Sequence, residues 1–208
     1  MCIRDSNRPT VKYFNSYPDV TILVAAYNEA PSIKETLLSL INQDYLGLIN
    51  ITVINDGSSD ATLDEVKKLQ VNHPTLKLID LGSNGGKAAA LNVGLKDSST
   101  DLIITVDGDC WIKSDGVGHL VNRYLSDPAG TKAVAGAILI RNSRENWITK
   151  AQEWDYFLGI AAIKRIQSLF QGTLVAQGAF SLYERATLIE VGGWPKTVGR
   201  ILFSLGKY

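Results

Sequence analysis

The sequence has few cysteines, no long apolar run and no excess of charge of either sign, and each absence excludes a class of protein. Its two cysteines, Cys2 and Cys110, offer no paired spacing for a disulfide framework, which fits a reducing compartment. The longest uninterrupted apolar runs, such as residues 156–163, have eight residues, far short of the roughly 20 that a membrane-spanning helix needs. Lysine plus arginine equals aspartate plus glutamate, at 21 each, so no positive field favours nucleic acid and we expect no nucleic-acid partner.

The remaining composition is that of a globular α/β domain. Hydrophobic residues make up 45% of the 208 residues, which is ample material for a core. Runs rich in isoleucine, valine and leucine predict extended segments at 20–26, 49–55, 76–80, 102–106, 131–140 and 174–183. Helical periodicity predicts helices between them, one of them capped by Asp60, and further helices over 146–170 and 185–191. Because strand and helix alternate four times, we expect a doubly wound, mostly parallel α/β sheet with helices on both faces.

Two aspartates directly follow the strand at 102–106, in the sequence Asp107-Gly108-Asp109. An open α/β sheet presents its ligand site at the carboxyl ends of its strands. Two carboxylates so close together repel each other unless a positive group lies between them, and hard oxygen ligands suit Mg or Mn. The same residue types also form ordinary strand-end turns. The pair alone therefore indicates either a divalent metal site or a turn.

Three further polar clusters stand at the ends of predicted strands or at the start of a helix. They are Tyr27-Asn28-Glu29, Asp56-Gly57 and Gly85-Gly86-Lys87. A helix start offers free N–H groups and the positive end of the helix dipole, and Lys87 adds a full charge. Together the clusters suit a nucleoside diphosphate whose charge is bridged to carboxylates by a metal. The glycine–lysine loop is not a P-loop, since Ala88 follows Lys87, and no G-x-G-x-x-G follows the first strand.

These motifs, in this order, resemble those of the family 2 glycosyltransferases, which have the GT-A fold. The resemblance rests on residues 20–29, 55–60, 84–87 and 106–109 and extends over about 20–199, nearly the whole chain. The second half, with Gln177-Gly178-Ala179, is more similar to the membrane-bound processive β-glycosyltransferases. Among these it is most similar to the poly-β-1,6-N-acetylglucosamine synthases.

The resemblance implies a role for individual residues. Those implied to bind the nucleotide sugar are Ala26, Tyr27, Glu29, Asp56, Lys87, Asp107 and Gly108. Asp109, together with Asp107, is implied to bind Mg or Mn. Gln177 and Gly178 are implied to line the path of the acceptor sugar.

Several of these positions also have a simpler explanation. Glu29 and Asp56 are suited to helix capping, and Lys87 to a solvated first turn of a helix. Gln177 is equally compatible with an ordinary strand residue.

The resemblance also divides the chain. Residues 17–199 are expected to form the glycosyltransferase domain, with a donor half at 17–141 and a partial acceptor half at 142–199. We expect residues 1–16 to be a non-native or disordered leader, and residues 200–208 to be an aberrant, truncated end.

An inverting transferase needs a general base for the acceptor hydroxyl, and the resemblance implies an acidic motif shortly after Gly199. The sequence continues there with Arg200 and has no carboxylate side chain after Glu190. We therefore expect this chain to bind the donor but to lack the catalytic base. No residue of the sequence is assigned as that base.

The function expected from the resemblance is inverting transfer from a UDP-sugar, UDP-N-acetylglucosamine in the first place, to a growing polysaccharide with the help of a divalent metal. Two alternatives remain open: a non-processive family 2 transferase with a lipid-phosphate acceptor, and a non-catalytic nucleotide-sugar binding module. The intact protein is expected at the cytoplasmic face of the cell membrane, whereas the chain itself should be soluble. The helix at 146–170 is expected either to face that membrane or to lie in the core.

Overall fold

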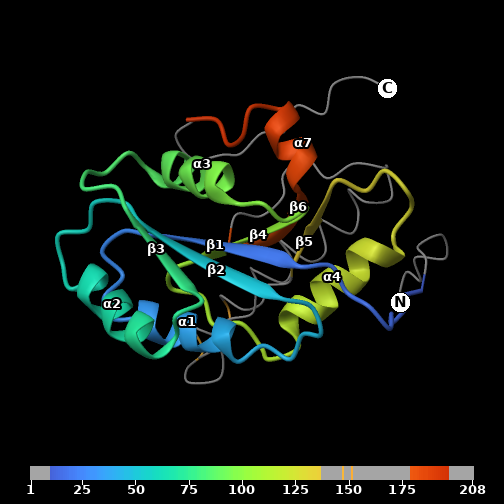
Figure 1. The fold of residues 1–208 in the computed structure, drawn as a ribbon, viewed down its shortest axis with the longest axis horizontal. Coiled ribbons are helices and arrows are strands. Elements are labelled where there is room, and N and C mark those ends of the chain that lie inside the picture. Colours follow the sequence, from blue (N-terminus) through green and yellow to red (C-terminus); the bar gives the residue numbers. More distant parts are fainter. Residues whose placement is uncertain (1–9, 137–146, 148–150, 152–178, 197–208) are drawn as a thin grey trace.

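The computed structural model describes residues 10–136, 147, 151 and 179–196 (Figure 1). Its strands are β1 (Val20–Ala26), β2 (Ile49–Asn55), β3 (Leu76–Asp80), β4 (Leu102–Asp107), β5 (Ala133–Ala135) and β6 (Phe180–Glu184). Its helices are α1 (Ile33–Ile41), α2 (Thr62–Asn72), α3 (Lys87–Asp97), α4 (Gly116–Ser126) and α7 (Arg185–Glu190). The strands form a single sheet of order β3-β2-β1-β4-β6-β5.

The sheet is mixed, with a parallel half that carries the site. Strands β3, β2, β1 and β4 are all parallel, whereas β6 pairs antiparallel with both β4 and β5. In the register, Ala26 lies beside Asn55, and Ala25 lies beside Asp107. The carboxyl ends of β1, β2 and β4 are therefore level, and the segments that follow them emerge at one edge. The prediction of a mostly parallel α/β sheet is confirmed.

Helices cover both faces of the sheet, as predicted. Helices α1, α2 and α4 lie on one face, and α3 and α7 lie on the other (Figure 1). Strand β1 is buried on both sides because its alternate residues enter different cores: Ile22 and Val24 pack toward the first face, and Leu23 toward the second. This explains why the strand reads as a continuous apolar run.

The order of the strands places a topological switch point between β1 and β4. From β1 the chain winds outward through α1 and α2 to β3, and α3 then crosses on the opposite face to reach β4 on the other side of β1. In open α/β sheets, ligands bind outside the carboxyl ends of the strands at such a point.

Some predicted boundaries differ from the structure. The segment predicted at 131–140 contains the three-residue strand β5, and the one predicted at 174–183 contains β6, which runs to Glu184. The cap of α2 is Ala61 rather than Asp60, although Asp60 Oδ1 still accepts a hydrogen bond from the Thr62 backbone N–H at 3.0 Å. The helix predicted at 185–191 ends at Glu190.

The predicted helix at 146–170 lies outside the described residues, except for Trp147 and Ala151, both of which are helical. Its expected position at a membrane or in the core therefore stays a prediction. Among the helices of the described ranges, none combines the length and the apolar character needed to cross a membrane.

Candidate functional site

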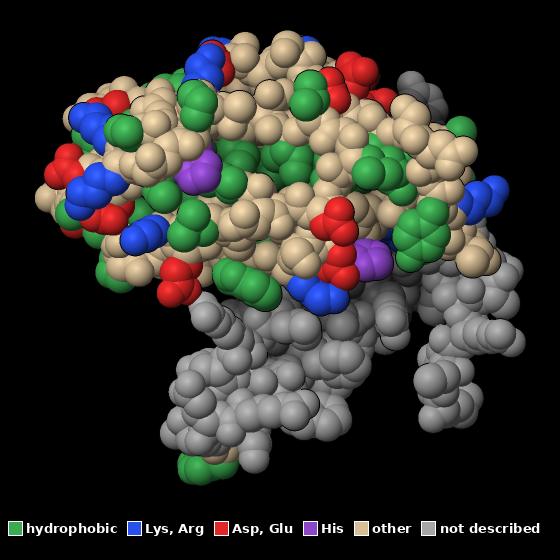
Figure 2. Space-filling view, turned by 60° about the horizontal axis from the view of Figure 1, so that its bottom comes forward, with side chains coloured by type: hydrophobic (Ala, Val, Ile, Leu, Met, Phe, Trp, Pro, Cys, Tyr) green, Lys and Arg blue, Asp and Glu red, His purple; other side chains and the backbone are tan. Residues whose placement is uncertain are grey.

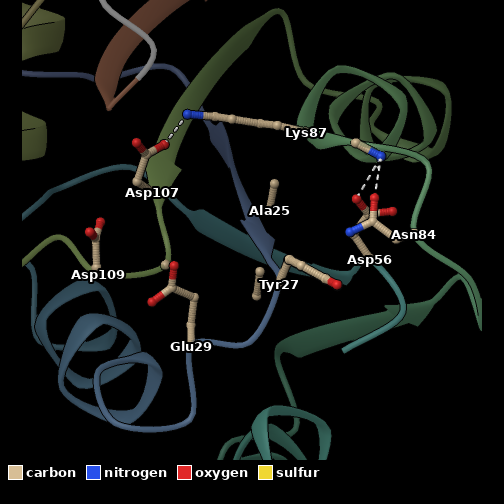
Figure 3. A pocket seen from close by; sticks show the side chains of 11 residues that line it. Ala25, Tyr27, Glu29, Asp56, Asn84, Lys87, Asp107 and Asp109 are labelled. Carbon is tan, nitrogen blue, oxygen red and sulfur yellow. Dashed lines mark hydrogen bonds and ion pairs between the residues drawn. The ribbon is translucent and has the colours of Figure 1, made fainter. Parts of the chain in front are cut away.

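A cleft of about 370 Å³ opens at the carboxyl ends of β1, β2 and β4. Its lining residues are Ala25, Ala26, Tyr27, Glu29, Asp56, Asn84, Gly86, Lys87, Asp107, Gly108 and Asp109. Every residue predicted for the nucleotide sugar or the metal is among them, and Figure 3 shows how most of their side chains lie. Gln177 and Gly178, predicted for the acceptor, lie outside the described residues.

Three lining residues were missed as site residues by the sequence reasoning: Ala25, Asn84 and Gly86. Asn84 and Gly86 belong to the loop before α3 whose glycines and lysine were recognised, so their position in that motif was the available signal. Ala25 has no such signal, because its place in the cleft follows from its register partner Asp107 across the sheet.

Asp56 holds the loop that begins α3. Its side chain is only 2% exposed. Its Oδ1 accepts a hydrogen bond from the Gly85 backbone N–H, and its Oδ2 accepts one from that of Gly86, each at 2.8 Å. Bonds to an ionised carboxylate are stronger than neutral ones. Asp56 therefore fixes the glycine loop, and its predicted role in binding the nucleotide sugar stays a prediction.

Gly57 lets the same loop approach closely. Its φ is +67°, a conformation that favours glycine. A Cβ added there would lie 2.5 Å from the carbonyl carbon of Ser83. Asp56 and Gly57 thus position residues 83–86 by a polar contact and by a steric requirement.

Lys87 and Asp107 face each other across the cleft. The Lys87 Nζ forms an ion pair with Asp107 Oδ1 (Figure 3). The side chains are 43% and 31% exposed, so solvent screens the pair and its contribution to stability is small. Lys87 therefore supplies part of the positive charge that Asp107 and Asp109 need between them.

Glu29 and Asp109 lie toward the end of the cleft that holds Asp107, opposite Asp56 (Figure 3). Figure 3 shows the Glu29 carboxylate directed toward Asp109, whereas Tyr27 extends toward Asp56. Glu29 Oε2 accepts a hydrogen bond from Ser32 Oγ at 3.0 Å. No side chain caps α1, so the capping alternative does not describe Glu29.

The donor atoms of this end fit a hard divalent cation that completes its ligands from a substrate. Across the described ranges, no three His, Cys, Asp or Glu side chains are grouped closely enough to hold a metal by themselves. Mg is commonly held by only one or two carboxylates together with substrate phosphates. Exposed Asp109 and half-exposed Asp107 offer such a pair.

Cys110, which follows Asp109, does not supply a nucleophile. Burial first, and then the nearby negative charges of Asp107 and Asp109, together raise the pKa of its thiol to about 12. Because the thiolate is the reactive form of cysteine, the protonated thiol stays inert near neutral pH.

Comparison with known proteins finds similar sequences over most of the chain. The sequence profile described as "Glycosyl transferase family 2" matches residues 21–192. The poly-beta-1,6-N-acetyl-D-glucosamine synthase of Staphylococcus aureus (strain COL) is 34% identical over 175 residues, which are 84% of this chain and 42% of the synthase. The Staphylococcus epidermidis synthase is 35% identical over the same shares. The chain thus spans about 42% of the length of these curated relatives.

Solved structures share the fold. A mannosyltransferase from Pyrobaculum calidifontis, in complex with GDP-Man and Mn2+, superposes with a TM-score of 0.74 at 27% identity, covering 93% of this chain and 51% of that protein. TarS from S. aureus, in complex with UDP-GlcNAc, has a TM-score of 0.55 at 22% identity, covering 85% of this chain and 48% of TarS. The second likeness bears on the fold alone.

Proposed function

We propose a reaction and a donor for this domain from one premise: the chain belongs to glycosyl transferase family 2. The proposed reaction is inverting transfer of a sugar from a UDP-sugar, UDP-N-acetylglucosamine in the first place, to a growing polysaccharide. The similarity to the staphylococcal synthases supports this choice of donor and product. The mannosyltransferase likeness supports a nucleoside diphosphate sugar as the class of ligand.

One observation carries the proposal: a lysine, a pair of aspartates and the start of a helix converge on one cleft at the β1/β4 switch point. The N–H groups of the first turn of α3 and the Lys87 ammonium suit phosphate oxygens. Tyr27 and Asp56 stand at the opposite end from Asp109 (Figure 3). The uridine would therefore lie toward Tyr27 and Asp56, and the diphosphate between Lys87 and the aspartates.

Asp109 and Asp107 would hold a divalent metal, Mg or Mn. A bound metal would contribute positive charge at the leaving diphosphate. Lys87 would contribute charge to the same group from α3. Lys87 also forms an ion pair with Asp107, so the phosphates of the donor would share the Lys87 ammonium with this carboxylate.

The proposed reaction exchanges one bond at the anomeric carbon for another. The acceptor hydroxyl oxygen attacks this carbon opposite the leaving group, the bond to the UDP oxygen breaks, and the hydroxyl proton passes to a base. Polymer synthesis would occur at the cytoplasmic face of the cell membrane, as the resemblance to the synthases implies. We assign neither the base nor the acceptor path to any of the described residues.

A panel of donors tests this proposal. We expect UDP-N-acetylglucosamine with Mn²⁺ to raise the thermal unfolding temperature of the chain more than GDP-mannose does at equal concentration. Ligand at a hundredfold excess over its dissociation constant stabilises a fold by about 2.7 kcal/mol. An equal or larger shift with GDP-mannose would contradict the UDP assignment. No shift with any nucleotide sugar would contradict donor binding altogether.

A further inference from the structure

Asn28 has an unusual backbone conformation between two residues of the cleft. Within the described part of the chain it is the one non-glycine residue with positive φ, at 57°. L-residues rarely adopt this conformation, and asparagine tolerates it better than most. Its neighbours Tyr27 and Glu29 both line the cleft, and Figure 3 shows their side chains pointing toward opposite ends of it.

The side chain of Asn28 ties this turn to the loop after β2. Its Oδ1 accepts a hydrogen bond from the Ser59 backbone N–H at 2.8 Å and one from Ser59 Oγ at 3.3 Å. Its own backbone N–H donates to Ser58 Oγ at 3.0 Å. The Asn28 conformation and the position of the loop therefore depend on each other.

The two following residues continue the same connection. The Glu29 backbone N–H donates to Thr62 Oγ1 at 2.8 Å, and that of Ala30 donates to Asp60 Oδ2 at 3.1 Å. Three consecutive N–H groups thus bond to side chains of residues 58–62. Asp56, just before this segment, holds the glycine loop on the other side of the cleft. Both walls of the cleft are consequently attached to one loop, residues 56–62.

We infer that Asn28 is a positioning residue that sets the nucleobase selectivity of the site, by holding Tyr27 at the nucleobase end of the cleft. This inference rests on the proposed function, because it takes the ligand to be a uridine nucleotide. Asn28 acts through Tyr27 and Glu29 and needs no contact with the ligand. When the hydrogen bonds between Asn28 and Ser59 hold the turn that carries Tyr27 in place, the nucleobase end of the cleft excludes a purine, which is larger than uracil. When these bonds are lost, the turn can move and admit the purine.

Three substitutions at Asn28 separate its backbone role from its side-chain role. Asn28→Asp keeps the tolerance of positive φ and the Oδ1 acceptor. Asn28→Gly keeps the conformation but loses the acceptor, and Asn28→Ala loses both. Asn72→Ala is the matched control, because Asn72 is exposed at the end of α2, away from the cleft. A thermal melt of each variant shows that it is folded.

Calorimetric titration of the full chain with UDP and with GDP, each with Mn²⁺, tests the inference. We expect Asn28→Gly to bind UDP about fivefold more weakly, because UDP must then order a wall that has lost the two Asn28 to Ser59 hydrogen bonds, and an ordering cost of about one net hydrogen bond corresponds to that change. Its preference for UDP over GDP should fall, whereas Asn28→Asp and Asn72→Ala should keep both values. If Asn28→Ala does not fold, the glycine and aspartate variants decide the question.

Two results would overturn the inference while leaving the proposed function intact. In the first, Asn28→Gly binds UDP and GDP as the wild type does. In the second, it loses affinity for both equally, so that the preference is unchanged and Asn28 serves stability alone. A wild-type chain that binds no UDP would instead contradict the proposed function, and the inference would fall with it.

Discussion

Lys87, the first residue of α3, and Asp107, the last residue of β4, form an ion pair across the cleft. The pair joins two elements on opposite sides of the switch point and partly neutralises the charge of Asp107. Asp109 Oδ1 accepts a long contact from the Cys110 thiol, at 3.7 Å. The cleft thus holds balanced charge at Lys87 and Asp107 and an exposed carboxylate at Asp109.

Replacing Lys87 should weaken ligand binding more, the more phosphate groups the ligand carries. We expect Lys87→Met to reduce UDP affinity about tenfold and uridine affinity hardly at all, because the ammonium acts on phosphate charge. Unfolding free energy should change by less than about 1 kcal/mol, since the ion pair is solvent-screened. Titrations with uridine, UMP and UDP measure the trend. Equal losses for all three ligands would show that Lys87 shapes the cleft rather than contacting phosphate.

Gly57 and Gly82 form a matched pair that tests whether the loop before α3 packs closely against Gly57. Both have φ of +67°, but a Cβ at Gly82 meets nothing within 4 Å, whereas one at Gly57 meets the backbone of Ser83 and Asn84. Gly82→Ala should cost about 1 kcal/mol of unfolding free energy through backbone strain alone. Gly57→Ala should cost clearly more and should also weaken UDP binding. Urea unfolding and titration of both variants check this, and equal costs would contradict the close approach of the two loops.

Glu184 should make the stability depend on acidic pH. The Lys132 ammonium, with a smaller contribution from Thr187, lowers the pKa of the Glu184 carboxyl in the folded chain. The unfolded state therefore takes up a proton first as the pH falls. The stabilisation is present above the unfolded pKa of about 4.5 and is lost as the pH falls through the lower folded value.

The comparison with Glu184→Gln makes this measurable. The wild type should be more stable than the variant at pH 7, by less than about 1 kcal/mol because solvent screens this partly exposed pair, and the difference should shrink as the pH falls below about 4.5. Urea unfolding over a series of pH values from 7 downward gives the difference. A difference that persists at low pH would show that it does not come from the charge of Glu184.

The parallel half of the fold could be predicted from the sequence because its signals are local. The predicted segments Val20–Ala26, Ile49–Asn55 and Leu76–Asp80 coincide with β1, β2 and β3. For β1 and most of β2 the reason is that a parallel strand buried on both faces needs apolar residues on both. The insertion of β6 between β4 and β5 was not predicted. It depends on pairing between residues far apart in the chain, which no local pattern encodes.

For the candidate site, the sequence likewise predicts which residues line the cleft better than it predicts the hydrogen bonds that they form. Most of the lining residues that stand at strand ends or helix starts were found, because those places are recognisable in sequence, whereas Ala25, Asn84 and Gly86 were missed. What each side chain bonds was not found. The Asp56 carboxylate bonds the Gly85 and Gly86 N–H groups, and Asn28 bonds Ser59, across about 30 residues of sequence in each case. Such contacts exist only after β1, β2 and α3 have packed together.

The metal dependence of UDP binding tests the central claim most directly. Calorimetric titration of UDP is made into the wild-type chain with Mn²⁺ and with EDTA, and into Asp109→Asn with Mn²⁺. We expect binding by the wild type with Mn²⁺ and affinity at least about tenfold weaker, a loss of about 1.4 kcal/mol, both in EDTA and in Asp109→Asn. Equal affinity under all three conditions would contradict the claim that Asp107 and Asp109 hold a metal at the diphosphate of a nucleotide sugar.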